Sequence, residues 1–158
     1  MDDETRWLTS HEQNAWLRLW AVSAWLPTRL DEQLKGDYGV NFHDFFALSQ
    51  ISMAPEEKLS MSQLAAVSDM SPSRLSHVVA RLEKRGWVER RSSESDRRTN
   101  YACLTPAGRT FIVEAAPSHV TRVRELVFDN LTPKETNELG RILEKVLAKL
   151  APTELPLV

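Results

Sequence analysis

The sequence predicts a mostly α-helical fold that contains one small β-hairpin. Apolar residues recur at helical spacing over most of the 158-residue chain, two short helical segments follow one another between residues 60 and 85, and a hairpin-like segment follows at once. Two short consecutive helices with a hairpin after them are the pattern of a winged helix-turn-helix, in which the hairpin is the wing. We therefore expect such a unit with helical regions on both sides of it.

The two central helices have clear start signals. Ser60 and Gln63 form a capping box that opens a helix of about two turns. Ser71 followed by Pro72 starts the second helix, because serine caps a helix and proline at the first helical position loses no hydrogen bond. Gly86 is expected to end it in a left-handed conformation. The apolar residues of this second helix share one side, which we expect to face inward: Leu75, Val78, Val79 and Leu82.

The polar side of the second helix suits contact with DNA. Arginine can hold guanine by two hydrogen bonds, serine can bond to bases or phosphates, and a helix N-terminus favours phosphate. We therefore expect the first turn of this helix, residues 71–77, to enter the major groove. A solvated helix face has the same composition, so the prediction depends on the neighbouring helix and hairpin.

Residues 87–91 and 100–104 predict two strands joined by a polar tip. Arg97 and Arg98 lie on this tip, and an arginine on a narrow hairpin suits the minor groove, where the negative potential is strongest. Asp96 would repel phosphate, so we expect it to orient an arginine. A charged tip with no partner is the alternative.

The charges are distributed unevenly along the chain. Residues 71–98 contain eight lysines and arginines against four acids, a balance of +4, whereas the whole chain carries −2, which leaves −6 elsewhere. A local positive field favours phosphate, and an acidic remainder limits indiscriminate binding to nucleic acid.

The N-terminal flank predicts two helices. Thr9 and Glu12 form a capping box that opens the first, which should bend at Pro27 and end at Gly36 and Gly39. A second helix is expected over residues 42–53.

The C-terminal flank is also helical. Thr105 and Pro106 open a long helix, with Pro117 as a kink, and Thr132 with Glu135 caps a last helix. The last helix carries an apolar stripe that demands a partner surface: Leu139, Ile142, Leu143, Val146, Leu147 and Leu150.

These elements predict a single domain over residues 1–158, with a DNA-binding lobe at 41–105 and a helical dimerisation region at 1–40 and 106–158. One winged helix is too small to cover both flanks, so we expect a homodimer that meets the two halves of a pseudo-palindromic site. Flanks that pack on their own chain are the alternative.

Other classes of function find little support. No apolar run is long enough to cross a bilayer, and the acidic N-terminus is unlike a secretory signal, so we expect a cytoplasmic protein without membrane contact. The single cysteine, Cys103, is more typical of a small strand residue than of a redox sensor. No serine-hydrolase, phosphate-loop or zinc-protease motif occurs, so we expect no catalytic residue, cofactor or metal. A winged helix that binds an acidic protein is the rival function.

The chain resembles the MarR family of bacterial transcriptional regulators. The resemblance covers nearly the whole chain and is carried by residues 62–65, 71–76, 81–90, 96–98 and 104–108, of which the Asp-x-Arg pattern of the wing and the following Leu-Thr-x-x-Gly are the most specific. It implies a triangular homodimer bound to an inverted repeat near a promoter. Carried over by position, base contacts fall on Ser71, Ser73, Arg74 and His77, a position nearer the DNA backbone on Arg81, and the wing pair on Asp96 and Arg98. We also expect Lys84 and Arg90 to contact the DNA backbone.

The resemblance also implies a repressor that a small, often anionic aromatic ligand releases from DNA. The ligand would bind in the cleft between the dimerisation helices and the DNA-binding lobe, where Trp16, Trp20, His43 and Phe46 are the candidates. Aromatic residues at helical spacing are more often core residues, and a DNA-binding protein without a ligand is an alternative.

Overall fold

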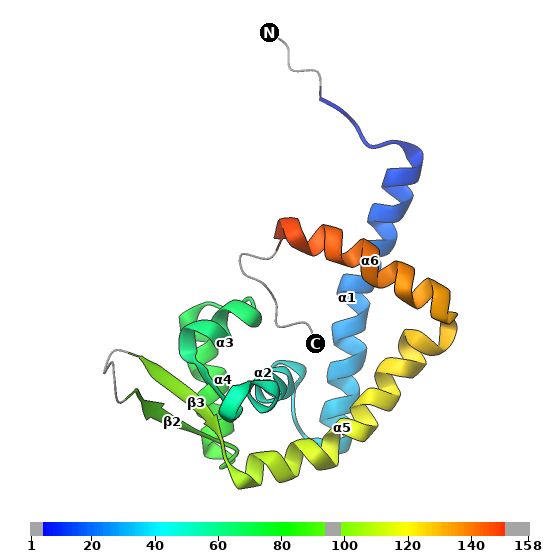
Figure 1. Cartoon of the computed structure of the whole chain (residues 1–158). Helices are drawn as coiled ribbons and strands as arrows, with labels where there is room; N and C mark the ends of the chain where they lie inside the picture. Colours follow the sequence, from blue (N-terminus) through cyan, green and yellow to red (C-terminus); the bar gives the residue numbers. More distant parts are fainter. Residues whose placement is uncertain (1–4, 94–98, 151–158) are drawn as a thin grey trace.

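The computed structural model describes residues 5–93 and 99–150 of the chain (Figure 1). Its helical order is α1 (Ser10–Tyr38), α2 (Phe42–Met53), α3 (Met61–Val67), α4 (Pro72–Lys84), α5 (Pro106–Leu126) and α6 (Pro133–Leu150), with short 3-10 turns at Pro55–Glu57 and Phe128–Asn130. The strands are β1 (Lys58–Ser60), β2 (Val88–Ser92) and β3 (Asn100–Leu104). The predicted fold class, mostly α-helical with a small β-hairpin, is confirmed.

The helices begin where the sequence places their caps. The side chains of Thr9, Ser60 and Ser71 each accept a hydrogen bond from a backbone N–H three residues further on, and those of Thr9 and Ser60 form complete capping boxes. Gly39 and Gly86 adopt the left-handed conformation that ends a helix, with φ of 63° and 73°. The expectation for Gly36 was wrong, because α1 continues through it to Tyr38.

The sheet has three strands in the order β1-β3-β2, and both pairs are antiparallel. β3 lies in the centre, with Arg90 opposite Ala102 on one side and Leu59 opposite Ala102 on the other. The sequence did not predict β1, which is three residues long and carries no alternating pattern of its own.

Two groups of buried residues hold the lobe together and attach it to α5. The larger group lies between α2, α3, α4 and the sheet, and the smaller one joins α1, α2 and α5. Trp87 and Phe111 pack against both groups, and their rings stack with centroids 3.9 Å apart and planes 12° apart. This stack fixes the base of the wing to the start of α5.

The outer helices leave apolar surface exposed. Every described residue of α1 as far as Trp25 is exposed, including Trp16, Trp20 and Trp25, and α6 buries none of its residues. In Figure 1, α5 leads away from the lobe to α6, and the first half of α1 extends beyond both. None of the described helices is long and apolar enough to cross a membrane.

Candidate nucleic-acid interface

The first turn of α4 is held rigidly by what precedes it. Asp69 adopts φ of 47°, Met70 is buried, and Ser71 Oγ accepts a hydrogen bond from the N–H of Arg74 at 3.3 Å. A left-handed residue, an apolar anchor and a cap therefore set the direction in which α4 leaves the turn. The helix buries Leu75, Val78, Val79 and Leu82, as the sequence predicted.

The outermost side of α4 is polar, small and exposed. Ser73, His77, Ala80 and Lys84 follow one another at spacings of three and four residues, and all four side chains are exposed. Ser71 is exposed at the start of the same helix. Small residues at the N-terminal end of such a face leave room for the backbone of a duplex to approach.

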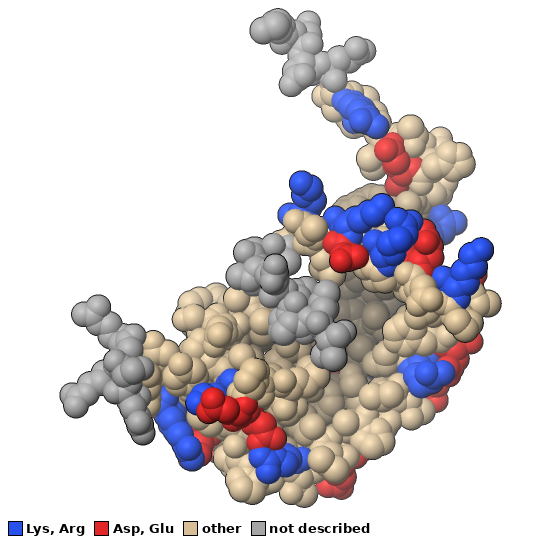
Figure 2. Space-filling view, viewed as in Figure 1, with Lys and Arg blue, Asp and Glu red and all other residues tan. Residues whose placement is uncertain are grey.

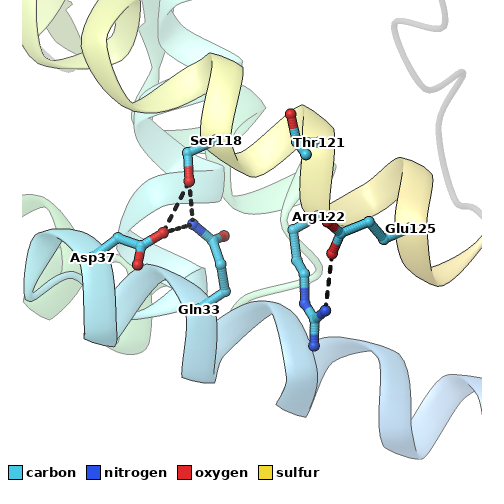
Figure 3. Close-up of a pocket in the computed structure, with 6 residues that line it drawn as sticks. All are labelled: Gln33, Asp37, Ser118, Thr121, Arg122 and Glu125. Atoms are coloured by element: carbon cyan, nitrogen blue, oxygen red, sulfur yellow. Dashed lines mark hydrogen bonds and ion pairs between the residues drawn. The ribbon is translucent and has the colours of Figure 1, made fainter.

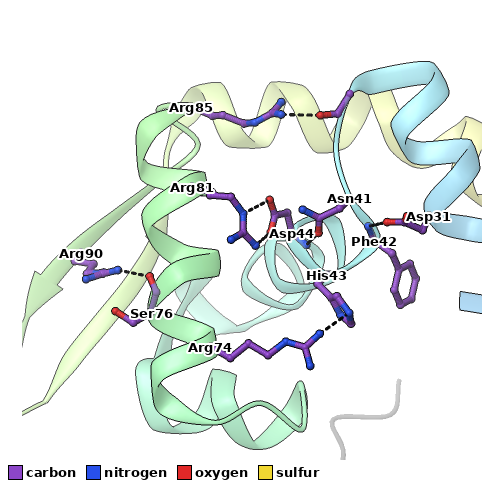
Figure 4. A network of polar contacts seen from close by, with 11 residues as sticks. Asp31, Asn41, Phe42, His43, Asp44, Arg74, Ser76, Arg81, Arg85 and Arg90 are labelled. Atoms are coloured by element: carbon purple, nitrogen blue, oxygen red, sulfur yellow. Dashed lines mark hydrogen bonds and ion pairs between the residues drawn. The ribbon is translucent and has the colours of Figure 1, made fainter. Parts of the chain in front are cut away.

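Three arginines, two on α4 and one directly after it, point to the same side: Arg74 and Arg81 reach the first turn of α2, and Arg85 reaches the end of α1 (Figure 4). Arg74 Nη2 lies 2.7 Å from His43 Nε2, and Arg85 Nη2 donates to the carbonyl of Gly39 at 2.6 Å. Arg81 donates from Nε and Nη2 to the two carboxylate oxygens of Asp44, at 2.9 and 2.6 Å. All three arginines are exposed, but their guanidinium groups bind acceptors of the same chain instead of pointing straight out into solvent.

These contacts refine the expectation that Arg74 and Arg81 simply point outward. Asp44 is 3% exposed, so the Arg81 pair reaches from the surface into the core. The hydrogen bond to Asp44 raises the pKa of Arg81, and burial together with the positive charge of Arg74 lowers the pKa of His43. His43 is therefore neutral at pH 7 and can accept a hydrogen bond from Arg74 through Nε2.

The opposite edge of α4 is tied to the wing. Arg90 on β2 donates from Nη2 to the carbonyl of Ser76 at 2.9 Å, and its backbone N–H donates to Glu83 Oε1 at 3.1 Å. Arg91 forms an ion pair with Glu89 on the same strand. Arg90 thus fixes the wing against α4. Its predicted contact with a DNA backbone would need this side chain to turn or to share its remaining donors.

The predicted wing residues Asp96, Arg97 and Arg98 lie outside the described residues, and their roles stay predictions. Figure 2 shows that basic and acidic side chains alternate beside the strands and along the outer helices, with a largely uncharged surface between them. The net positive balance of residues 71–98 therefore includes arginines that are already paired with acids within the lobe.

The four predicted ligand residues fall into two separate groups. Trp16 and Trp20 pack on each other with ring centroids 5.8 Å apart, while Phe46 packs on Phe42. The contact between α1 and the start of α2 lies at Asp31, whose Oδ1 accepts from the N–H of Phe42 at 2.8 Å. Trp20 is eleven residues before Asp31, about 16 Å along a helix. Within one chain the two tryptophans are therefore remote from α2.

A polar pocket of about 270 Å³ lies between α1 and α5 (Figure 3), and it contains none of the four candidates. Gln33 Nε2 donates to Asp37 Oδ2 at 2.7 Å and to Ser118 Oγ at 3.1 Å, and Ser118 Oγ donates to the same carboxylate at 2.9 Å. Arg122 pairs with Glu125 at its other end. The bonds of Ser118 to Gln33 and Asp37 join α1 to α5, and the hydrogen bonds from Gln33 and Ser118 lower the pKa of Asp37.

Cys103 lies half-buried on β3, and burial raises the pKa of its thiol. A protonated thiol is a poor nucleophile, which agrees with its interpretation as a small strand residue. Within the described ranges, histidines, cysteines and acids form no group of three that could hold a metal ion.

An exposed helix whose N-terminal turn is preorganised, supported by a second helix and flanked by a three-stranded sheet, defines the winged helix-turn-helix class. The chain belongs to the MarR family of transcriptional regulators within that class. A family model described as MarR family matches residues 38–99, which include α2, α3 and α4.

Two relatives in sequence are named as transcriptional regulators. The chain is 31% identical to the transcriptional repressor MprA of Escherichia coli over 116 residues, which is 73% of this chain and 65% of MprA. It is 32% identical to the regulator PapX of Escherichia coli, over 72% of this chain and 68% of PapX. The chain thus spans about two thirds of the length of these relatives. None of them is named as an enzyme.

Two solved structures from Streptomyces coelicolor share the fold over nearly their whole length. Sco3205, a MarR family regulator solved in complex with DNA, has a TM-score of 0.87 at 40% identity and covers 93% of this chain and 96% of its own. AbsC has the same TM-score at 36% identity and covers 94% of this chain and 100% of its own.

Proposed function

We propose that this chain is a transcriptional repressor that binds an inverted-repeat operator as a homodimer, and that α4 is its recognition helix. The observation that supports this most strongly is the exposed polar side of α4, which begins at a capped and fixed N-terminal turn. Base contacts are assigned to Ser71, Ser73, Arg74 and His77, backbone contacts to Arg81, Lys84 and Arg90, and the minor-groove contact to Arg97 and Arg98 beside Asp96.

The homodimer accounts for the apolar surface that a single chain leaves exposed. Leu150 of α6 is 71% exposed, Trp20 and Trp25 of α1 are 61% and 60% exposed, and Val120 of α5 is 54% exposed. Exposed apolar side chains on the outer helices of a chain are typical of an oligomer contact. A second copy of the same chain would bury it and would set two α4 helices about one turn of DNA apart.

The proposal includes release from DNA by a small aromatic ligand, which would bind in a cleft that two chains form together. The tryptophans of α1 are separated from His43 and Phe46, so a cleft that contains all four residues requires a second subunit. The ligand site therefore exists only if the chain forms the dimer. A dissociated monomer should lose binding of an aromatic anion such as salicylate.

The proposal is tested by an electrophoretic shift. Random duplexes are selected with the purified protein, and the enriched duplex is then bound with excess unrelated competitor present. Enrichment of an inverted repeat that resists competition supports the proposal. Failure to bind any duplex, even at low salt where phosphate contacts are strongest, favours the rival protein-binding function.

A further inference from the structure

The contact between Arg74 and His43 joins the start of the recognition helix to a different element of the lobe. Arg74 comes from the first turn of α4 and His43 from the first turn of α2, and 2.7 Å separates Nη2 from Nε2 (Figure 4). Both side chains are exposed. An ion pair between Arg81 and the buried Asp44 already holds α4 on α2. The contact between Arg74 and His43 is therefore not needed to attach the two helices.

The chemistry of the contact leaves Arg74 able to read a base. A guanidinium group has five N–H donors, and one hydrogen bond to an imidazole nitrogen leaves four of them free. A bidentate contact with guanine needs two donors on one edge. A long arginine side chain loses rotamer freedom when it binds, so an acceptor that already holds it reduces the cost of ordering.

We propose that His43 is a positioning residue for base recognition: its neutral imidazole holds the Arg74 guanidinium so that the remaining donors meet one base pair of the operator. The inference rests on the proposed role of Arg74 in DNA binding and adds a residue of α2 to that site. His43 touches Arg74 rather than DNA.

Protonation of His43 removes the acceptor and places a second positive charge beside Arg74. The charged groups that act on His43 come from all three helices around it: Asp31 on α1, Asp44 on α2, and Arg74 with Arg81 on α4. Burial and Arg74 lower the pKa of His43, so the neutral form is the resting state at pH 7. Base discrimination through Arg74 should therefore weaken as the pH falls below neutrality.

The test measures base discrimination rather than total affinity, because added positive charge strengthens binding to every duplex alike. Each base pair of an operator selected in vitro is changed in turn, and the ratio of affinities for the preferred and changed duplex is measured. Arg74→Ala identifies the position that Arg74 reads. His43→Leu removes the acceptor, and His43→Gln keeps an acceptor of similar reach that does not titrate.

His43→Leu should lower the ratio at the Arg74 position by roughly three- to tenfold, the size of a coupling between residues in contact, and leave the other positions unchanged. His43→Gln should restore the ratio and remove its pH dependence. In the wild type the ratio should fall as the pH is lowered below the ordinary histidine pKa of about 6.5.

Two results would overturn the inference while leaving the proposed function intact: an unchanged ratio at the Arg74 position in His43→Leu, or an equal loss at every position. The second would mean that His43 supports the lobe in general, which a thermal unfolding measurement of the same variant would register. If Arg74→Ala itself changes no position, the assigned role of Arg74 fails first.

Discussion

Gly108 lies so close to the carbonyl oxygen of Trp87 that a side chain has no room. A Cβ on Gly108 would lie 2.2 Å from that oxygen and 2.9 Å from Leu104 Cδ1. The same junction is tied by Thr105, whose Oγ1 donates to the carbonyl of Gly86 at 2.6 Å and accepts from the N–H of Gly108 at 3.0 Å. The residues of the Leu-Thr-x-x-Gly pattern thus allow α5 to pack against the base of the wing.

Gly108→Ala should therefore destabilise the protein by about 1 to 3 kcal/mol, because a backbone carbonyl must move to admit the methyl group. Chemical unfolding measures this. Gly140→Ala is the matched control, since Gly140 also lies in a helix but has nothing within 4 Å of its Cβ position. The control should be neutral or stabilising by up to about 1 kcal/mol. Equal stability of the two variants would contradict the close packing.

Removing Arg81 alone should destabilise the protein more than removing Arg81 and the charge of Asp44 together. Arg81→Ala leaves a buried carboxylate without its two hydrogen bonds and should cost about 2 to 4 kcal/mol, less than a fully buried pair because water reaches Arg81. Adding Asp44→Asn should recover part of that loss. Arg85→Ala is the control, because the carbonyl of Gly39 can bond to water instead. A loss in Arg85→Ala as large as that in Arg81→Ala would contradict the assignment.

The burial of His119 predicts that acid destabilises the folded protein. It packs on Phe45 with ring centroids 4.6 Å apart, its Nδ1 is buried with no hydrogen-bond partner among the described residues, and burial lowers its pKa. The unfolded chain therefore binds the proton first, and the free energy of unfolding should fall as the pH drops below about 6.5. Above that pH, His119 should contribute no pH dependence to the free energy of unfolding.

Denaturation between pH 7.5 and pH 5 measures this slope. His119→Phe should flatten it but leave the part due to His43, whose pKa is also lowered. His11→Gln, which changes an exposed histidine of α1, is the matched control. A wild-type slope in His119→Phe would show that burial of His119 does not contribute.

Much of the fold was predictable because its signals are local. The caps at Thr9, Ser60 and Ser71 depend on hydrogen bonds that span three residues, so the sequence shows them directly. Strand β1 depends on pairing with β3 some forty residues away, and nothing within its three residues indicates a strand. Gly36 did not end α1, because tolerated glycines inside helices cannot be distinguished locally from terminal ones.

The predicted DNA contacts stay predictions, and the sequence did not show which residues of the lobe the arginines bind. Arg74 and Arg81 are exposed, as expected, but their hydrogen bonds reach residues 31 and 37 positions away in the chain. Asp44 is the residue that sequence reasoning missed. An aspartate in the first turn of a helix normally faces solvent and interacts with the helix dipole, so its burial became visible only when α4 was packed on α2.

Leu143→Asp should dissociate the proposed dimer without unfolding the lobe. Leu143 lies on the apolar stripe of α6 and is 37% exposed within one chain, so only an interface would make the new charge costly. Sedimentation velocity should show a monomer, and circular dichroism should show helices preserved. Lys145→Asp, two residues further and so on roughly the opposite side of the helix, should remain dimeric. A wild-type dimer in Leu143→Asp would exclude this stripe from the interface.

Hydroxyl-radical footprinting on an operator selected in vitro tests most directly whether two α4 helices bind symmetric half-sites. Two protected segments should appear, related by two-fold symmetry and centred about 10 base pairs apart, and both should weaken together in Leu143→Asp. A single asymmetric footprint, or a symmetric footprint that persists unchanged in a monomeric variant, would contradict the account.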